Sequence, residues 1–111
     1  RRQRQMCIRD SMKIYNIYEN INFDKDKEIE ELIFENEKIK ILRTTSLNQV
    51  TDYYDQEELE IVKIVQGSAI LEIEGKEIKL KKGDILPISP HQVHRVIYQD
   101  HVVWLCIFVK N

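Results

Sequence analysis

The sequence predicts an all-β domain with one short helix near its N-terminus. From Ile39 onward, apolar residues alternate with polar residues, which is typical of strands that bury one face. Short apolar segments recur along this part of the chain, and turn-forming residues separate them. Many short strands separated by close turns favour a β-sandwich or barrel over a fold in which helices alternate with parallel strands.

The helix is predicted just before the strands begin. If residues 26–34 are helical, Ile29, Leu32 and Ile33 fall on one face of that helix. We therefore expect residues 12–37 to form a lead-in with one short helix, and residues 38–111 to form the barrel. The first strand is expected near residues 39–43, where the hydrophobic period changes to two.

Turn residues divide the remaining chain into short strands. Glycine supplies a positive φ in two predicted turns, at residues 74–76 and 82–84, and Gly67 is expected to end a strand. Ser89 and Pro90 predict a further bend. After a polar loop over residues 48–57, the expected strands are 59–65, 69–73, 78–80, 85–88, 94–98 and 102–109.

The first eleven residues differ from the rest of the chain. They contain four arginines, whereas the remaining residues contain only Arg43 and Arg95. The string RRQRQMCIRDS resembles the translation of a sequencing adapter, so we expect residues 1–11 to be a non-native tail and the native chain to begin at Met12. A basic arm that binds nucleic acid and a mitochondrial presequence are the alternatives.

Charge and hydropathy exclude several classes of protein. The formal net charge of −2 gives no reason to expect a nucleic-acid partner. The longest apolar run covers residues 102–109, well short of the roughly 18 residues that cross a membrane. Cys7 and Cys106 are too few and too far apart for a disulfide framework, which favours a cytoplasmic setting. Cys106 is expected to be a small buried hydrophobe.

Two segments carry a specific resemblance to a known family. Glu60 is followed by Gly67 across six residues, and Gly83 precedes His94 across ten, with Ser89 and Pro90 between them. These spacings resemble the two motifs of cupins, G-x5-H-x-H-x3,4-E-x6-G and G-x5-P-x-G-x2-H-x3-N, over residues 38–109. The resemblance implies a double-stranded β-helix, the jelly-roll barrel of small single-domain bacterial cupins.

The same resemblance implies a candidate metal site in an altered form. Metal-binding cupins hold a divalent ion with three histidines and one glutamate. Glu60 and His94 take two of these positions, while Tyr53 and Asp55 stand where the paired histidines belong. Asp55, Glu60 and His94 could still ligate Fe, Mn, Ni or Zn, with Tyr53 as a fourth oxygen.

A metal-free interpretation stands beside it. A carboxylate inside an apolar barrel needs a polar partner, and His94 on the opposing strand could supply it. Such a hydrogen-bonded pair would raise the pKa of the histidine. The sequence leaves both interpretations open.

The predicted function is the binding of a small polar ligand in the barrel by Tyr53, Asp55, Gln56, Glu60 and His94. The alternative is an enzyme of the oxygenase or isomerase type. It would depend on a metal at Glu60, His94 and Asp55, or use His94 and Glu60 as an acid–base pair. A third hypothesis is a purely structural module.

A homodimer is also expected. Ile61 and Val65 fall on the outward face of a predicted strand, and cupins usually cover such a face with a second copy.

Overall fold

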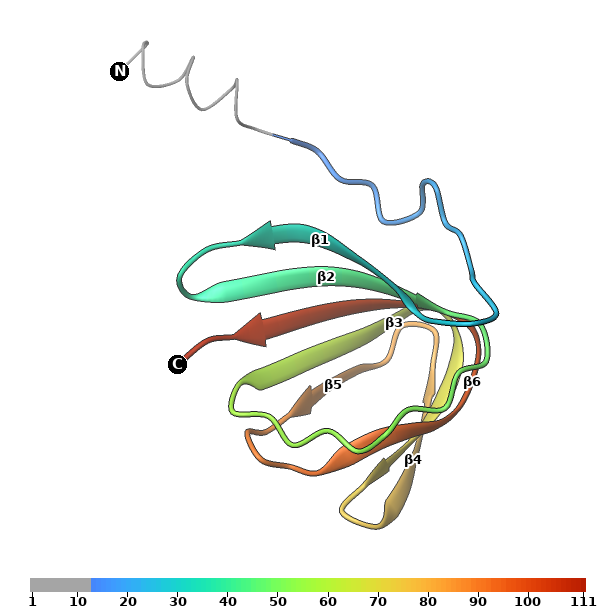
Figure 1. Cartoon of the computed structure of the whole chain (residues 1–111), viewed down its shortest axis with the longest axis vertical. Coiled ribbons are helices and arrows are strands. Elements are labelled where there is room, and N and C mark those ends of the chain that lie inside the picture. The colour runs from blue at the N-terminus through green and yellow to red at the C-terminus, as the bar shows by residue number, and fades with distance from the viewer. Residues whose placement is uncertain (1–12) are drawn as a thin grey trace.

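A computed structural model describes residues 13–111 of the chain as six β-strands (Figure 1). The predicted non-native tail at residues 1–11 lies outside the described residues. All strand pairs are antiparallel, and the sheet order is β1-β2-β6-β3-β4, with β5 paired to β3. The strands are β1 (Ile29–Glu35), β2 (Ile39–Ser46), β3 (Leu59–Ile73), β4 (Lys76–Lys81), β5 (Ile85–Ile88) and β6 (His94–Val109).

The predicted helix is wrong, because that segment forms strand β1. Ile29 pairs with Thr45 and Glu35 with Lys40. β1 therefore supplies hydrogen-bond partners for backbone N–H and C=O groups along one edge of β2. Side chains of β1 alternate between the two faces: Ile33 is half-buried, whereas Leu32 on the other face is 56% exposed. A helix would put these two residues on the same face, so sheet pairing overrides the local pattern.

Two long strands replace four of the predicted short ones. β3 has 15 residues and β6 has 16, and each bends where the sequence predicts a break. At the bend Gly67 has a φ of 89°, and a Cβ atom there would lie 2.4 Å from the carbonyl oxygen of His101. Gly67 therefore does not end a strand as predicted. It lets β3 bend against β6, with register shifts on both sides of it.

The two predicted glycine turns are confirmed. Glu74 and Gly75 join β3 to β4 with φ values of 50° and 83°, the positive pair that a type I′ hairpin turn requires. Gly83, with a φ of 92°, lies in the turn between β4 and β5, and its N–H donates to the carbonyl of Ile64. These turns direct β4 and β5 back along β3.

The hydrophobic core lies between the folded halves of the sheet. Ile64, Ile88 and Val102 are almost completely buried there, and they come from β3, β5 and β6. In residues 13–111, no helix is long and apolar enough to cross a membrane.

The lead-in segment is fastened to the sheet by one buried arginine. Arg43 on β2 is 2% exposed, and its guanidinium donates to the carbonyl oxygens of Ile17, Glu19 and Asn20. The same guanidinium pairs with the carboxylate of Glu31 at 2.6 Å. The lead-in is thus held by charge-assisted hydrogen bonds on the opposite face of the sheet from the residues described next.

Candidate functional site

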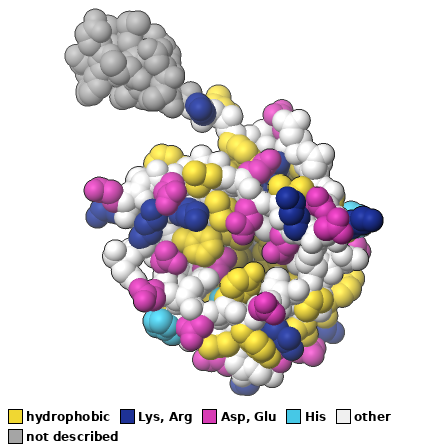
Figure 2. Space-filling model, viewed as in Figure 1, with side chains coloured by type: hydrophobic (Ala, Val, Ile, Leu, Met, Phe, Trp, Pro, Cys, Tyr) yellow, Lys and Arg dark blue, Asp and Glu magenta, His cyan; other side chains and the backbone are white. Residues whose placement is uncertain are grey.

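One pocket opens on the concave side of the curled sheet. It has a cavity volume of about 120 Å³, and Figure 2 shows hydrophobic and acidic side chains gathered around a hollow on this face. β2, β3 and β6 contribute both apolar and polar side chains to its wall, and further polar side chains come from the region of β1 and from the loop between β2 and β3. The lining residues are Glu28, Glu30, Leu42, Thr44, Thr51, Tyr54, Gln56, Glu60, Val62, Leu71, Ile88, His94, Val96, Trp104, Cys106 and Phe108.

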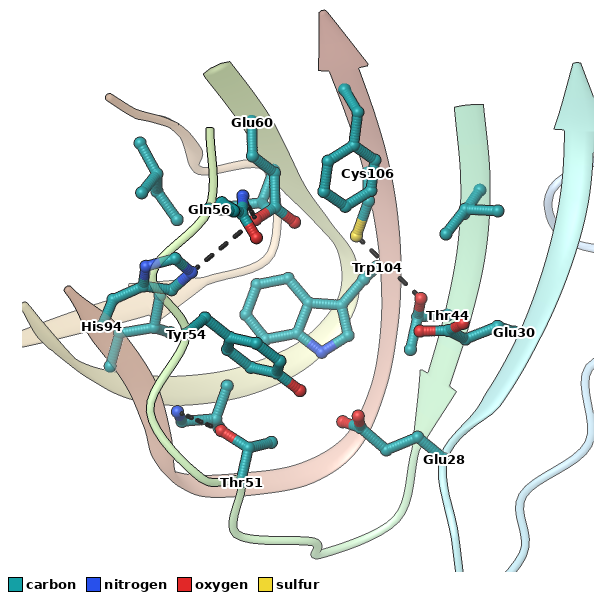
Figure 3. Close-up of a pocket in the computed structure, with 16 residues that line it drawn as sticks. Glu28, Glu30, Thr44, Thr51, Tyr54, Gln56, Glu60, His94, Trp104 and Cys106 are labelled. Carbon is teal, nitrogen blue, oxygen red and sulfur yellow. Dashed lines mark hydrogen bonds and ion pairs between the residues drawn. The ribbon is translucent and has the colours of Figure 1, made fainter. Parts of the chain in front are cut away.

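Three polar side chains meet at one side of this pocket (Figure 3). Gln56 Nε2 donates to Glu60 Oε1 at 2.8 Å, and His94 Nε2 lies 3.7 Å from the same oxygen. Glu60 is 8% exposed and His94 is 4% exposed. Glu60 and Val62 line the pocket from β3, and His94 enters it as the first residue of β6. The structure therefore brings together three of the five residues that the sequence suggested for a site.

The environment of His94 favours its charged form. Its Nδ1 lies 2.7 Å from the carbonyl oxygen of Gln92, so Nδ1 carries a proton and donates it. Burial alone lowers the pKa of His94, but the Glu60 carboxylate and the Gln92 carbonyl outweigh burial and raise it. Because Nδ1 is occupied, Nε2 is the nitrogen that gains or loses a proton, and it faces the pocket.

The loop before β3 covers part of the pocket and is tied to β6 by its backbone. Tyr54 exchanges two backbone hydrogen bonds with His94, at 2.7 and 3.1 Å. Thr51 N–H donates to the carbonyl of Val96 at 3.0 Å. The Tyr54 ring lies 5.5 Å from the His94 ring, and burial, followed by the charge of Glu28, raises the pKa of its hydroxyl. This short β-bridge determines which loop side chains enter the pocket.

Asp55 and Tyr53 lie outside the pocket. Asp55 is paired with His91 at 2.8 Å and its side chain is 58% exposed. Tyr53 donates to Glu72 at 2.7 Å and stacks against the Arg95 guanidinium at 4.6 Å. The structure does not bring either residue to Glu60 and His94.

The bridge at Tyr54 explains this placement. In extended backbone, alternate residues face opposite sides, so Tyr54 and Gln56 point inward while their neighbours Tyr53 and Asp55 point outward. The cupin motif allows three or four residues between its second histidine and its glutamate. Four residues select Tyr53 and Asp55 for the histidine positions, and three select Tyr54 and Gln56, so the motif allows both assignments and the bridge decides between them.

Two acidic residues on the far side of the pocket were missed by the sequence reasoning. Glu28, which immediately precedes β1, and Glu30, its second residue, line the pocket. The Glu28 carboxylate accepts hydrogen bonds from Ser46 Oγ at 2.6 Å and Gln99 Nε2 at 3.0 Å. They were missed because this segment was assigned to a helix outside the barrel. Polar and apolar residues alternate at Glu28, Ile29 and Glu30, which is typical of a strand. Interpreting this segment as a strand would have placed the two glutamates on one face.

Cys106 lies in the pocket wall and is not activated. Its side chain is buried, and burial raises the pKa of the thiol well above its ordinary value. The thiol therefore stays protonated at neutral pH, and a protonated thiol is a poor nucleophile. Its Sγ lies 4.0 Å from the Thr44 hydroxyl.

The residues around His94 do not fit the divalent metal that a cupin motif implies. Within residues 13–111, no three His, Cys, Asp or Glu side chains lie close enough to hold an ion. The histidine positions are taken by Tyr54 and Gln56, and the Gln56 amide already donates to a Glu60 oxygen. Glu60 and His94 alone supply two ligands, whereas zinc sites in proteins use at least three.

The family model of the cupin domain matches residues 49–108. A solved structure from Ralstonia eutropha, a putative mannose-6-phosphate isomerase, is 30% identical with a TM-score of 0.84, over 90% of this chain and 100% of that one. An RmlC-like cupin from Desulfovibrio desulfuricans is 22% identical with a TM-score of 0.78, over 88% and 96% of the two chains. A Streptococcus pyogenes protein of unknown function is 14% identical with a TM-score of 0.77, over 89% and 88%. No curated protein matches the chain significantly.

These comparisons agree with the geometry. The matched segment contains the loop with Tyr54, the long strand β3, all but the last residue of β6, and both pocket residues of the motifs, Glu60 and His94. The antiparallel all-β architecture is that of the solved cupin structures. The chain therefore belongs to the cupin domain family.

Proposed function

We propose that this cupin-domain protein binds a small polar molecule in the pocket beside Glu60 and His94. The observation that carries the proposal is the state of these two side chains. Both side chains are largely buried, yet within the described residues no hydrogen bond reaches His94 Nε2 or Glu60 Oε2. Both residues line the pocket, so these two atoms are free to bind a ligand placed there.

The ligand set of the proposal differs from the one that the sequence suggested. Gln56, Glu60 and His94 remain, and Tyr54 takes the place of Tyr53 and Asp55. Because the side chains near His94 do not fit a metal, binding rests on hydrogen bonds and on the charges of the chain itself. The proposed fold of the whole domain is the double-stranded β-helix, which would place this pocket in the lumen.

An isomerase is the second candidate function. The putative mannose-6-phosphate isomerase from Ralstonia eutropha is similar over nearly the whole chain. An isomerisation that moves a proton between carbons needs a group that removes the proton and a group that returns it. His94, whose pKa is raised, and Glu60 lie close enough to the pocket to divide these roles without a metal.

A binding screen with pocket variants tests the proposal. Polar metabolites that raise the melting temperature of the wild-type protein are assayed again with Glu60→Gln and His94→Gln. Asp55→Asn is the matched control, because it neutralises a nearby carboxylate that lies outside the pocket. We expect the thermal shifts to disappear in the two pocket variants and to persist in the control. Shifts that persist in both pocket variants would overturn the proposal.

A further inference from the structure

The pocket has an unusual balance of charge. Three carboxylates line it, from Glu28, Glu30 and Glu60, and His94 is its only basic side chain. No lysine or arginine is among the lining residues of the described chain. The pocket therefore carries about three negative charges when His94 is neutral and about two when it is protonated, since each group contributes one charge.

The carboxylates stand on opposite sides of the cavity. Glu60 lies beside His94, while Glu28 and Glu30 approach from β1, with Tyr54 and Trp104 between the two groups (Figure 3). Glu28 Oε2 is held by Ser46 and Gln99, and its other oxygen accepts no hydrogen bond from the described residues. A ligand between the two sides would meet free carboxylate oxygens on both of them.

A second observation points to a ligand independently of the acidic residues. The His94 side chain is 5% exposed, and its Nε2 faces the cavity without a hydrogen bond, because 3.7 Å to Glu60 is too long for one. When His94 is protonated, the Glu60 carboxylate 3.7 Å away balances its charge, so the Glu28 and Glu30 carboxylates remain without a basic partner among the lining residues. Carboxylate oxygens are acceptors, which suits a ligand rich in N–H donors.

The aromatic residues of the pocket favour the same kind of ligand. Trp104 Nε1 donates to Gln99 at 3.0 Å, so the indole offers its ring to the pocket and not its N–H group. Tyr54 and Phe108 add two more rings to the lining. The faces of aromatic rings attract cations, most strongly when the cation is desolvated.

We propose that the pocket selects a small organic cation, such as an alkylammonium, and rejects phosphorylated ligands. This inference rests on the proposed binding function and names its ligand class. The cation would lie between Glu60 and the Glu28–Glu30 side, against Trp104. A phosphate group would meet only like charges here, which costs affinity.

The single tryptophan of the chain provides the measurement. Trp104 lies in the pocket wall, so its fluorescence reports on occupancy. Wild-type protein is titrated with ethylammonium and tetramethylammonium chloride, with mannose, and with mannose 6-phosphate, at constant ionic strength adjusted with sodium chloride. Glu30→Gln is the test variant, because Glu30 makes no hydrogen bond within the described residues. Glu37→Gln removes the same charge from the exposed hairpin between β1 and β2.

We expect saturable changes with the two ammonium ions and none with mannose 6-phosphate. Binding of the ammonium ions should weaken about tenfold in Glu30→Gln and stay unchanged in Glu37→Gln, since the variant loses a charged partner of the ligand. Tighter binding of mannose or of mannose 6-phosphate would overturn the inference and leave the proposed binding function standing. If no probe of any charge changes Trp104 fluorescence, the inference is overturned, and the screen with Glu60→Gln and His94→Gln decides the binding function separately.

Discussion

His94 Nε2 lies 3.7 Å from Glu60 Oε1 inside the pocket, and both side chains are nearly buried. The distance is that of an ion pair and not of a short hydrogen bond, so the two groups interact through charge while both still face the cavity. This relationship determines how the site titrates and which variants are informative.

The pKa of His94 depends on Glu60. Because the Glu60 carboxylate stabilises the imidazolium, Glu60→Gln should lower the pKa of His94 relative to the wild type. The pKa is measured by NMR titration of the imidazole resonances. Glu77→Gln, on the exposed part of β4, is the control and should leave it unchanged. A His94 pKa that is equal or higher in Glu60→Gln would contradict the assignment.

The raised pKa also makes stability depend on pH. The folded state binds the His94 proton more tightly than the unfolded state, whose histidines titrate near 6.5. The stabilisation is therefore complete below about pH 6.5 and is lost as the pH rises through the folded-state pKa. Urea unfolding of the wild type and His94→Gln should show a free-energy difference that shrinks with rising pH. A free-energy difference that grows with rising pH would contradict a raised pKa of His94 in the folded state.

Gly67 should be the least replaceable glycine of the domain. In Gly67→Ala the new Cβ would lie 2.4 Å from the His101 carbonyl oxygen, so β3 and β6 must separate. Gly83→Ala is the matched control, because its φ is 92° but nothing lies within 4 Å of the new atom. We expect the control to lose about 1–2 kcal/mol of unfolding free energy from its left-handed backbone. Gly67→Ala should lose clearly more, and equal losses would show that the close contact is unimportant.

Arg43 should contribute more to stability than the other arginine of the described chain. Arg43→Met would leave three carbonyl groups and the Glu31 carboxylate without their donor, at a cost of about 3 kcal/mol. Arg95→Met removes a partly exposed pair with Glu72 and should cost about 1 kcal/mol or less. Chemical denaturation compares the two variants. Similar losses would mean that the lead-in segment does not depend on Arg43.

The homodimer remains a proposal, now supported by different residues. Val65 is 5% exposed within a single chain and needs no partner to cover it. Leu32 and Phe34 on the edge strand β1 are 56% and 48% exposed, and an apolar edge strand is a common place for a second copy to pair. Light scattering should give twice the mass of the chain for the wild type, and the monomer mass for Leu32→Lys with Phe34→Lys. A monomeric wild type would exclude the dimer.

The strands and the two motif residues could be predicted from the sequence because they depend on local patterns. Alternation indicated β2 to β6, and fixed spacing from Gly67 and Gly83 singled out Glu60 and His94. β1 could not be predicted in this way, because its pairing with β2 is a tertiary contact that competes with an acceptable helical pattern. Glu28 and Glu30 were missed for the same reason.

The loop before β3 shows a second kind of limit. The choice between Tyr53 with Asp55 and Tyr54 with Gln56 is a shift of one residue, and such a shift exchanges the two faces of an extended segment. Only the backbone bridge between Tyr54 and His94 decides it. Composition and spacing do not contain that contact.

The central claim is that ligands bind beside Glu60 and His94, and the three histidines of the chain allow a direct test. His94 is buried in the pocket, whereas the side chains of His91 and His101 are 64% and 60% exposed outside it. In protein labelled with ¹⁵N-histidine, compounds that stabilise the fold should shift the resonances of His94 in a saturable way and leave the other two unchanged. Saturable shifts at His91 or His101, with His94 unaffected, would contradict the account.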